Sequence, residues 1–181
     1  RARGGVWAAT LYVPEYGREY NQLKLRIMQG QARRFGHATP SVFDCKWQSH
    51  EFVTIAQTQT TWEQVAATQG SPVMVCDTDA FVTSFWHERY MGSGDEALRA
   101  IVDALPRRSL YVLTDIHDVM FEQDGLRDGE HVRVDRHCAF KQALHQQSVP
   151  WVEVKGTVVE RVSQVVQAIE HLRHPFELDV S

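Results

Sequence analysis

The sequence has no long apolar run and only three cysteines among its 181 residues. A membrane-spanning helix needs about 18 or more apolar residues in succession, so the sequence predicts no membrane segment and no membrane partner. Cys45, Cys76 and Cys138 are widely spaced and form no Cys-x-x-Cys pair. Because a secretory apolar segment is also missing, we expect no disulfide framework and a reducing, cytoplasmic location.

Positive charge is also scarce. The 19 basic residues are outnumbered by 23 acidic ones, which gives a net charge of -4 and a pI near 6.1. Without a basic field, the chain is not expected to bind nucleic acid. Only four of the basic residues are lysines. The arginine dominance suits bidentate phosphate recognition, although a GC-rich genome produces the same bias.

The histidines do not follow a zinc-binding pattern. There are nine in the chain, and His131, His137 and His145 lie around Cys138. Structural zinc sites usually show pairs of closely spaced ligands, and these residues have no such spacing. The sequence therefore predicts no zinc site in this region.

Apolar periodicity predicts strands that alternate with helices. Expected strands lie at 6–13, 72–76, 109–114 and 149–154, and expected helices at 17–30, 49–68, 80–91, 95–105, 135–147 and 157–173. Alternation of this kind is typical of an α/β domain, with a parallel sheet covered by helices on both faces. We expect one such domain over residues 1–174, a fifth strand upstream, and a frayed tail at 175–181.

Expected helix starts are marked by capping residues. Ser49 precedes the second helix, Ser93 with Glu96 forms a capping box for the fourth, and Thr157 with Glu160 forms one for the last.

Two carboxylates follow the apolar run 72–76. Asp77 and Asp79 come where a buried parallel strand should end, and an amphipathic stretch follows at once. Ligands of open α/β sheets bind beyond the carboxyl ends of their strands. We therefore expect both carboxylates at the mouth of a site, where they can hold Mg²⁺ and a hydroxyl group. The alternative for Asp79 is a helix cap.

Three short segments resemble one known family. They are "VPEYGREY" at 13–20, "VCDTDAFVT" at 75–83, and Asp124-Gly125-Leu126-Arg127 followed by Asp135-Arg136. In this order they resemble the ribosylnicotinamide kinase domain of the bacterial NadR family, a P-loop small-molecule kinase similar to AAA-type ATPases. The resemblance implies that the first two segments end the second and third strands, and that the last belongs to a mobile lid at about 115–134.

The chain departs from this family in one respect. P-loop kinases carry G-x-x-x-x-G-K-[ST] to hold phosphates, and this sequence contains no Gly-Lys dipeptide. The opening residues 1–5 read as the end of a helix with a glycine C-cap. We expect that the first strand, the P-loop and most of the first helix precede Arg1. The alternative is a domain that has lost nucleotide binding.

The resemblance and the residue types together suggest roles around the acceptor. Asp77 is the candidate for metal binding and for the catalytic base, although Glu15 could also be the base. Glu15 and Asp79 are expected to bind sugar hydroxyls. Arg18 either contacts substrate or supports Glu15 by a salt bridge. Trp47 lies in an irregular segment and is the candidate for stacking on a cationic ring.

Trp62 and Trp86 fall at helical apolar spacing, and core packing explains them better than stacking on substrate.

Arginines in the expected lid are candidates for phosphate binding. Arg127 and Arg136 match the family segment, and Arg133 lies between them. A lid that closes would bring these guanidinium groups onto the β- and γ-phosphates and exclude water. The alternative is a solvated loop with ordinary surface arginines.

The resulting hypothesis is an ATP- and Mg²⁺-dependent kinase that phosphorylates the 5′-hydroxyl of nicotinamide riboside. The acceptor comes from the resemblance alone. Alternatives are a kinase for another nucleoside or metabolite, and a nucleotide-responsive regulatory domain without turnover. The sequence carries no signal for an oligomeric state.

Residues 1–181 alone should bind ATP poorly, because their sequence has no Gly-Lys segment to surround the phosphates. Calorimetric titration with Mg-ATP tests this expectation, and micromolar binding would contradict it.

Overall fold

The computed structural model describes residues 7–117 and 119–173, and the chain divides into two compact units. The first unit ends at Leu105 and the second begins at Pro106. Both units contain a pair of parallel strands together with helices, so the α/β class is correct. The expected helix end at 1–5 and the expected tail at 175–181 lie outside the described residues.

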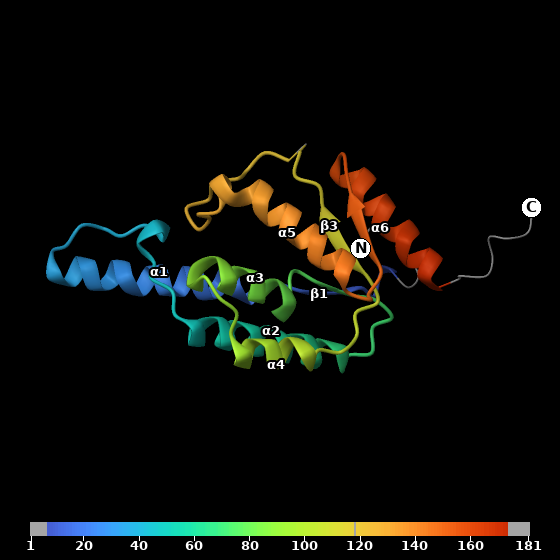
Figure 1. Cartoon of the computed structure of the whole chain (residues 1–181), viewed down its shortest axis with the longest axis horizontal. Helices are drawn as coiled ribbons and strands as arrows, with labels where there is room; N and C mark the ends of the chain where they lie inside the picture. The colour runs from blue at the N-terminus through green and yellow to red at the C-terminus, as the bar shows by residue number, and fades with distance from the viewer. Residues whose placement is uncertain (1–6, 118, 174–181) are drawn as a thin grey trace, which may run out of the picture. The chain divides into compact units, whose positions relative to one another are not determined.

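From residue 7 onward, where the structure describes it, the first unit contains two strands and four α-helices. In chain order these are β1 (Leu11–Val13), α1 (Tyr16–Phe35), the 3₁₀ turn η2 (Val42–Asp44), α2 (Ser49–Ala67), β2 (Met74–Cys76), α3 (Ala80–Met91) and α4 (Glu96–Asp103). Helix α2 contacts α1, α3, α4 and both strands, and Figure 1 shows it running beside α1 and α4.

Strands β1 and β2 pair in parallel. Leu11 is opposite Met74, and Val13 is opposite Cys76. Val13 is buried, whereas Tyr12 and Val75 remain exposed on the other face of the pair. The two carboxyl ends therefore lie side by side.

The apolar core of this unit forms around α2. Phe52 and Ala56 of α2 pack with Ala80 of α3 and Leu98 of α4. Trp86 packs against the same cluster as a partly buried residue, which agrees with the core role expected for it.

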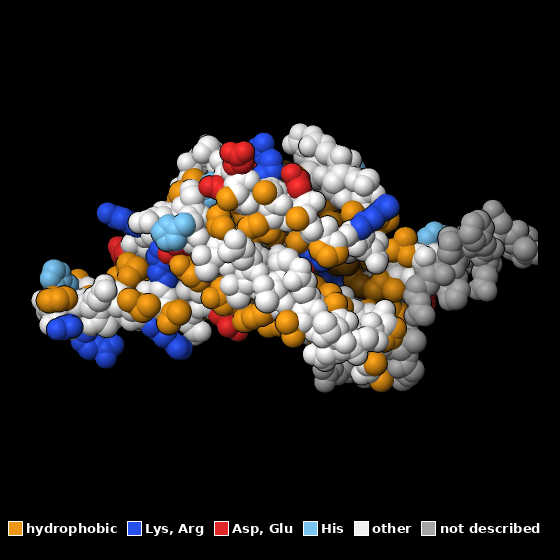
Figure 2. Space-filling model, turned by 90° about the horizontal axis from the view of Figure 1, so that it is seen from below, with side chains coloured by type: hydrophobic (Ala, Val, Ile, Leu, Met, Phe, Trp, Pro, Cys, Tyr) orange, Lys and Arg blue, Asp and Glu red, His pale blue; other side chains and the backbone are white. Residues whose placement is uncertain are grey.

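Helix α1 is longer than the periodicity predicted. It continues through Gly30 and ends at Phe35, and Gly36, with a φ of 67°, provides the left-handed C-cap. A glycine inside a helix costs only about 1 kcal/mol, so Gly30 does not end it. Arg33 and Arg34 occupy the last turn, where cations complement the helix dipole. Figure 2 shows blue basic side chains gathered at this end of α1, on the left of the view.

The capping residue of α2 differs from the expected Ser49. Gln48 is the N-cap and forms a capping box with Glu51, whose carboxylate accepts the Gln48 N–H at 2.8 Å. The Ser49 hydroxyl is instead 2.9 Å from Nε2 of His87, a core residue of α3. Ser49 therefore connects two helices, a role that local spacing does not reveal.

The other two expected caps have different outcomes. Helix α4 is capped by Asp95, which accepts the N–H of Leu98 at 2.9 Å, so the expected cap at Ser93 is wrong. At the last helix, the Glu160 carboxylate accepts the N–H of Thr157 at 2.7 Å, and the expected capping box is confirmed.

The second unit has the same kinds of element. It contains β3 (Tyr111–Thr114), the 3₁₀ turn η3 (Glu130–Val132), α5 (Arg133–Gln146), β4 (Trp151–Val154) and α6 (Val158–Arg173). Strands β3 and β4 are parallel, with Leu113 opposite Glu153 and Thr114 opposite Val154. The backbone pairing continues one residue further, because the N–H of Asp115 donates to the carbonyl of Val154 at 2.9 Å.

The single sheet expected from the alternating pattern is not observed. Within the described ranges, the strands form two separate parallel pairs, β1–β2 and β3–β4. Each strand is three or four residues long, and among the described residues neither pair is extended by a third strand. Periodicity identifies a strand but not its neighbour, which depends on tertiary contacts.

Among the described helices, none is both long enough and apolar enough to cross a membrane.

Candidate active site

Two carboxylates come together because β1 and β2 end at the same edge. The N–H of Asp77 donates to the carbonyl of Val13 at 2.8 Å, which extends the pairing by one residue. Glu15 follows Val13 by two residues. Residues from chain segments more than 60 positions apart thus share one edge of the pair, as the sequence analysis expected of strand-end carboxylates.

Asp77 is exposed and carries a hydrogen bond from Tyr12. The Tyr12 hydroxyl donates to Oδ2 of Asp77 at 3.0 Å. Tyr12 lies opposite Val75, two residues before Asp77, so both side chains lie on the same face of the pair. Partial burial raises the pKa of Tyr12, and the bond to Asp77 raises it further. The sequence did not identify Tyr12 as a site residue. The pattern that could have indicated it is the alternation of buried and exposed positions along β1, which places Tyr12 on the exposed face.

Asp79 is the N-cap of α3. Its carboxylate accepts the N–H of Val82 at 3.1 Å, and the residue is only 3% exposed. The capping role weighed for this residue is therefore present. Whether Asp79 also binds a sugar hydroxyl stays a prediction.

The backbone between these two aspartates is strained. Thr78 has a φ of 64°, and it is the one residue other than glycine with a positive φ in the part of the chain that the structure describes. A β-branched residue in the left-handed region is unfavourable by roughly 1–2 kcal/mol. Such outliers concentrate at functional sites, so this turn supports the choice of Asp77 and Asp79.

Glu15 begins α1 but does not cap it with its side chain. Instead, Gln59 of α2 accepts the N–H of Tyr16 at 2.9 Å. Gln59 is 1% exposed, and its Nε2 lies 3.4 Å from Oε1 of Glu63. Gln59 therefore fixes the turn that carries Glu15.

Arg18 and Trp47 have different surroundings. Arg18 lies exposed in the first turn of α1. Trp47 packs on Phe52 and Tyr90, with ring centroids 5.2 and 5.6 Å apart, and Nζ of Lys24 lies 4.5 Å from its ring centre. The Lys24 ammonium group thus already makes a cation–π contact with the Trp47 ring, the kind of contact expected of a cationic substrate. Substrate stacking by Trp47 remains a prediction.

The segment expected to form a lid contains an ordered turn. The Asp124 carboxylate accepts the N–H of Leu126 at 3.0 Å, and Gly125 has a φ of 78°. Arg127 is exposed, and its Nε lies 3.7 Å from the Asp124 carboxylate. Asp124 therefore shapes the turn and holds the arginine near it. The two ends of the expected lid are more regular, since Asp115 extends β3 and Arg133 begins α5.

Arg133 and Arg136 are on the first turns of α5, and both are partly buried. Nε of Arg136 is buried and makes no hydrogen bond within the described residues. A buried N–H without a partner is uncommon in proteins, which fits a guanidinium group that is satisfied by a ligand. Arg127, Arg133 and Arg136 are in the second unit, whereas Glu15, Asp77 and Asp79 are in the first.

The AAA domain profile matches residues 6–161, which cover most of both units. The chain belongs to the AAA domain family. A comparison with curated proteins gave no match. AAA domains are P-loop nucleotide-binding domains, so membership supports nucleotide binding as the general function.

In this AAA domain the carboxylates at the strand ends have oxygen donors of the kind that Mg²⁺ prefers. Asp77 is exposed, and the bond from Tyr12 occupies Oδ2. The residues present therefore fit a magnesium ion at Asp77, bound directly or through water.

Replacement of Thr78 tests the strain at this turn. Thr78→Gly should leave the free energy of unfolding unchanged or raise it by up to about 1 kcal/mol, because glycine tolerates a positive φ. Thr68→Gly is the matched control, since Thr68 has a φ of -64°. The free energy of unfolding of the control should fall by roughly 0.4–1 kcal/mol, because glycine has more conformational freedom in the unfolded chain. Chemical denaturation measures both, and equal losses would show that Thr78 is not strained.

Proposed function

We propose that this AAA domain is part of an ATP-dependent small-molecule kinase, which transfers the γ-phosphate of ATP to the 5′-hydroxyl of nicotinamide riboside. The observation that carries the proposal is the placement of Glu15 and Asp77 at adjacent strand ends within a domain of this family. The choice of acceptor comes from the resemblance of segments 13–20, 75–83 and 124–136 to ribosylnicotinamide kinase domains.

Phosphoryl transfer requires mainly positioning and charge neutralisation. Asp77 is suited to accept the proton of the acceptor hydroxyl or to hold the metal, because it is exposed at the strand end. Its bond from Tyr12 orients the carboxylate. When bound, Mg²⁺ would neutralise phosphate charge and help align the transferring group.

Glu15 is suited to bind the sugar. It lies at the neighbouring strand end, and Gln59 holds the backbone of the next residue. A carboxylate at such a position can accept hydrogen bonds from two neighbouring ribose hydroxyls. The same arrangement suits other nucleosides, so a kinase for another nucleoside is the nearest alternative.

The arginines of the second unit would bind the phosphates of the nucleotide. Arg127 and Arg136 are suited to the β- and γ-phosphates by charge and planar geometry. The unsatisfied Nε of Arg136 supports this assignment. Arg133, one helical turn before Arg136, is a further candidate.

Asp77→Asn in the full-length gene product should lower kcat at least about a hundredfold, because an amide cannot replace the carboxylate as base or metal ligand. Asp103→Asn is the control, since Asp103 is an exposed carboxylate at the end of α4. Steady-state kinetics with Mg-ATP and nicotinamide riboside measures the effect. Normal turnover in the Asp77 variant would remove this residue from the mechanism.

Arg127→Ala should lower kcat more than it raises the KM for the nucleoside, because its expected partner is the transferring phosphate. Arg107→Ala is the control for loss of an exposed arginine in the same unit. If the variant changed only the nucleoside KM, the loop would belong to the acceptor pocket instead.

A nucleotide-responsive domain without turnover is the second candidate, and the absence of a Gly-Lys dipeptide from the sequence favours it. A panel of nucleosides incubated with Mg-ATP separates the candidates. Phosphorylation of nicotinamide riboside above all others supports the first proposal, phosphorylation of another nucleoside changes the acceptor, and nucleotide binding without any product supports the second candidate.

A further inference from the structure

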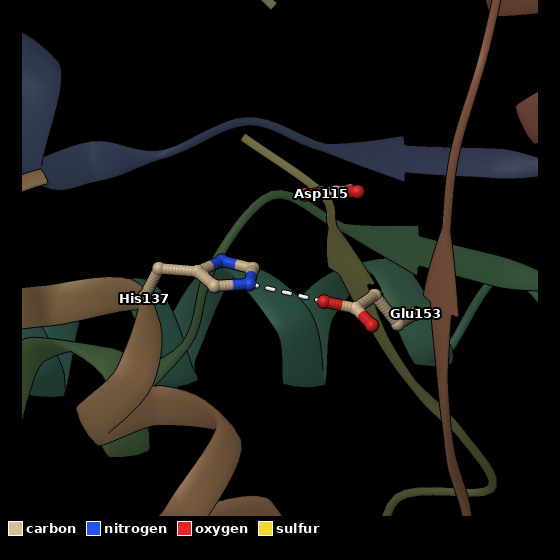
Figure 3. A group of neighbouring side chains, drawn as sticks. All are labelled: Asp115, His137 and Glu153. Carbon is tan, nitrogen blue, oxygen red and sulfur yellow. Dashed lines mark hydrogen bonds and ion pairs between the residues drawn. The ribbon is translucent and has the colours of Figure 1, made fainter. Parts of the chain in front are cut away.

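Three ligand-type side chains converge in the second unit, outside the residues assigned to phosphoryl transfer. Asp115 comes directly after β3, Glu153 is in β4 and His137 is in α5. Figure 3 shows the His137 ring and the Glu153 carboxylate pointing toward each other, with Asp115 beside them. Leu113 pairs with Glu153, so Asp115 and Glu153 are on the same face of the strand pair.

The distances suit a shared ion. One ligand atom from each of the three residues lies within 4.8 Å of the other two, and Nε2 of His137 is 3.0 Å from Oε1 of Glu153. Asp115 is 7% exposed and His137 8%. These donors are therefore held in place by three separate elements and are largely shielded from solvent.

We propose that Asp115, His137 and Glu153 form a binding site for a first-row divalent transition metal, with Zn²⁺ as the best-suited ion. One imidazole nitrogen with two carboxylate oxygens is a donor set used for Zn²⁺, whereas an all-oxygen set is typical of Mg²⁺. The site differs from the magnesium position at Asp77 in its residues and in its chemistry. It does not depend on the proposed kinase function.

Two lysines compete with the metal for these carboxylates. Lys141 donates to Oε2 of Glu153 at 2.8 Å, on the opposite oxygen from His137. Nζ of Lys155 lies 3.5 Å from Oδ2 of Asp115 and 3.8 Å from Oε2 of Glu153. Lys155 is 61% exposed, so it can move into solvent when a divalent ion replaces it. Lys141 can remain in place.

The remaining contacts leave suitable atoms for the metal. The Nδ1 of His117 is 2.6 Å from Oδ1 of Asp115, which orients that carboxylate and leaves Oδ2 toward Lys155. On metal binding, Nε2 of His137 would exchange its contact with Glu153 for the metal, and the ring proton would reside on Nδ1. Asp115 Oδ2, Glu153 Oε1 and His137 Nε2 are then the three ligands, with water completing the coordination.

Titration of the chain with Zn²⁺ alone tests the site. Calorimetry should give saturable one-to-one binding, and His137→Gln should weaken it at least tenfold, roughly the minimum loss for removing a directly bound ligand. His145→Gln is the matched control from the same helix, and it should bind as the unchanged chain does. The titrations use a Cys138→Ser background, because an exposed free thiol next to His137 can bind Zn²⁺ independently of the proposed site.

Lys155→Met gives the sharpest outcome, because it removes an exposed competing cation without touching a ligand. It should raise the Zn²⁺ affinity roughly three- to tenfold, as expected for loss of a like charge near the ion. If the network is purely structural, neither the unchanged chain nor Lys155→Met will bind Zn²⁺ saturably. That result, or binding unaffected by His137→Gln, would overturn the proposal. The absorption spectrum of Co²⁺ added to the Lys155→Met variant gives a second test. A spectrum typical of nitrogen and oxygen ligands supports the proposed site, and a spectrum identical to that of free Co²⁺ contradicts it.

Discussion

Parallel pairing between distant chain segments is the constraint on which the candidate active site depends. Leu11 pairs with Met74, and the N–H of Asp77 reaches the carbonyl of Val13 only because the two strands run in the same direction. An antiparallel pair would place Glu15 and Asp77 at opposite ends. Parallel strands need a long crossover, and here α1 and α2 supply it. The length of the segment between the two motifs is therefore a requirement of the site.

Helix α2 holds α1 largely through partly buried polar contacts. Nζ of Lys24 lies 2.6 Å from the Glu51 carboxylate, and the Tyr20 hydroxyl donates to the same group at 3.1 Å. The side-chain oxygen of Gln59 accepts a hydrogen bond from the first backbone N–H of α1, that of Tyr16. The Lys24 and Glu51 side chains are only 16% and 10% exposed, so this ion pair should contribute more than a surface pair, which is typically worth about 0–1 kcal/mol. These contacts fix the orientation of α1 and hence the position of Glu15 at its start.

Local patterns predicted some elements well and could not predict others. Helix α3 has the expected bounds because Asp79 and Gly92 mark its two ends. The predicted end of α1 was wrong, because Gly30 lies inside the helix although a glycine commonly marks a helix C-terminus. The bonds of Tyr12 with Asp77 and of Gln59 with Tyr16 join residues 65 and 43 positions apart, which no local spacing encodes. The same holds for His137, which comes together with Asp115 and Glu153 from three separate elements.

Among the acidic residues of the first unit, burial separates those that stabilise the fold from those that are candidates for chemistry. Asp79 is 3% exposed and caps a helix, and Glu51 is 8% exposed and holds α1. Their carboxylates have structural partners in the folded chain. Asp77, in contrast, is exposed, follows a strand end and precedes a strained residue. A carboxylate with a structural role is buried and hydrogen-bonded within the protein, whereas a carboxylate that binds a ligand must be accessible to it. Exposure together with fixed backbone geometry is therefore what makes Asp77 the strongest candidate for the chemical step.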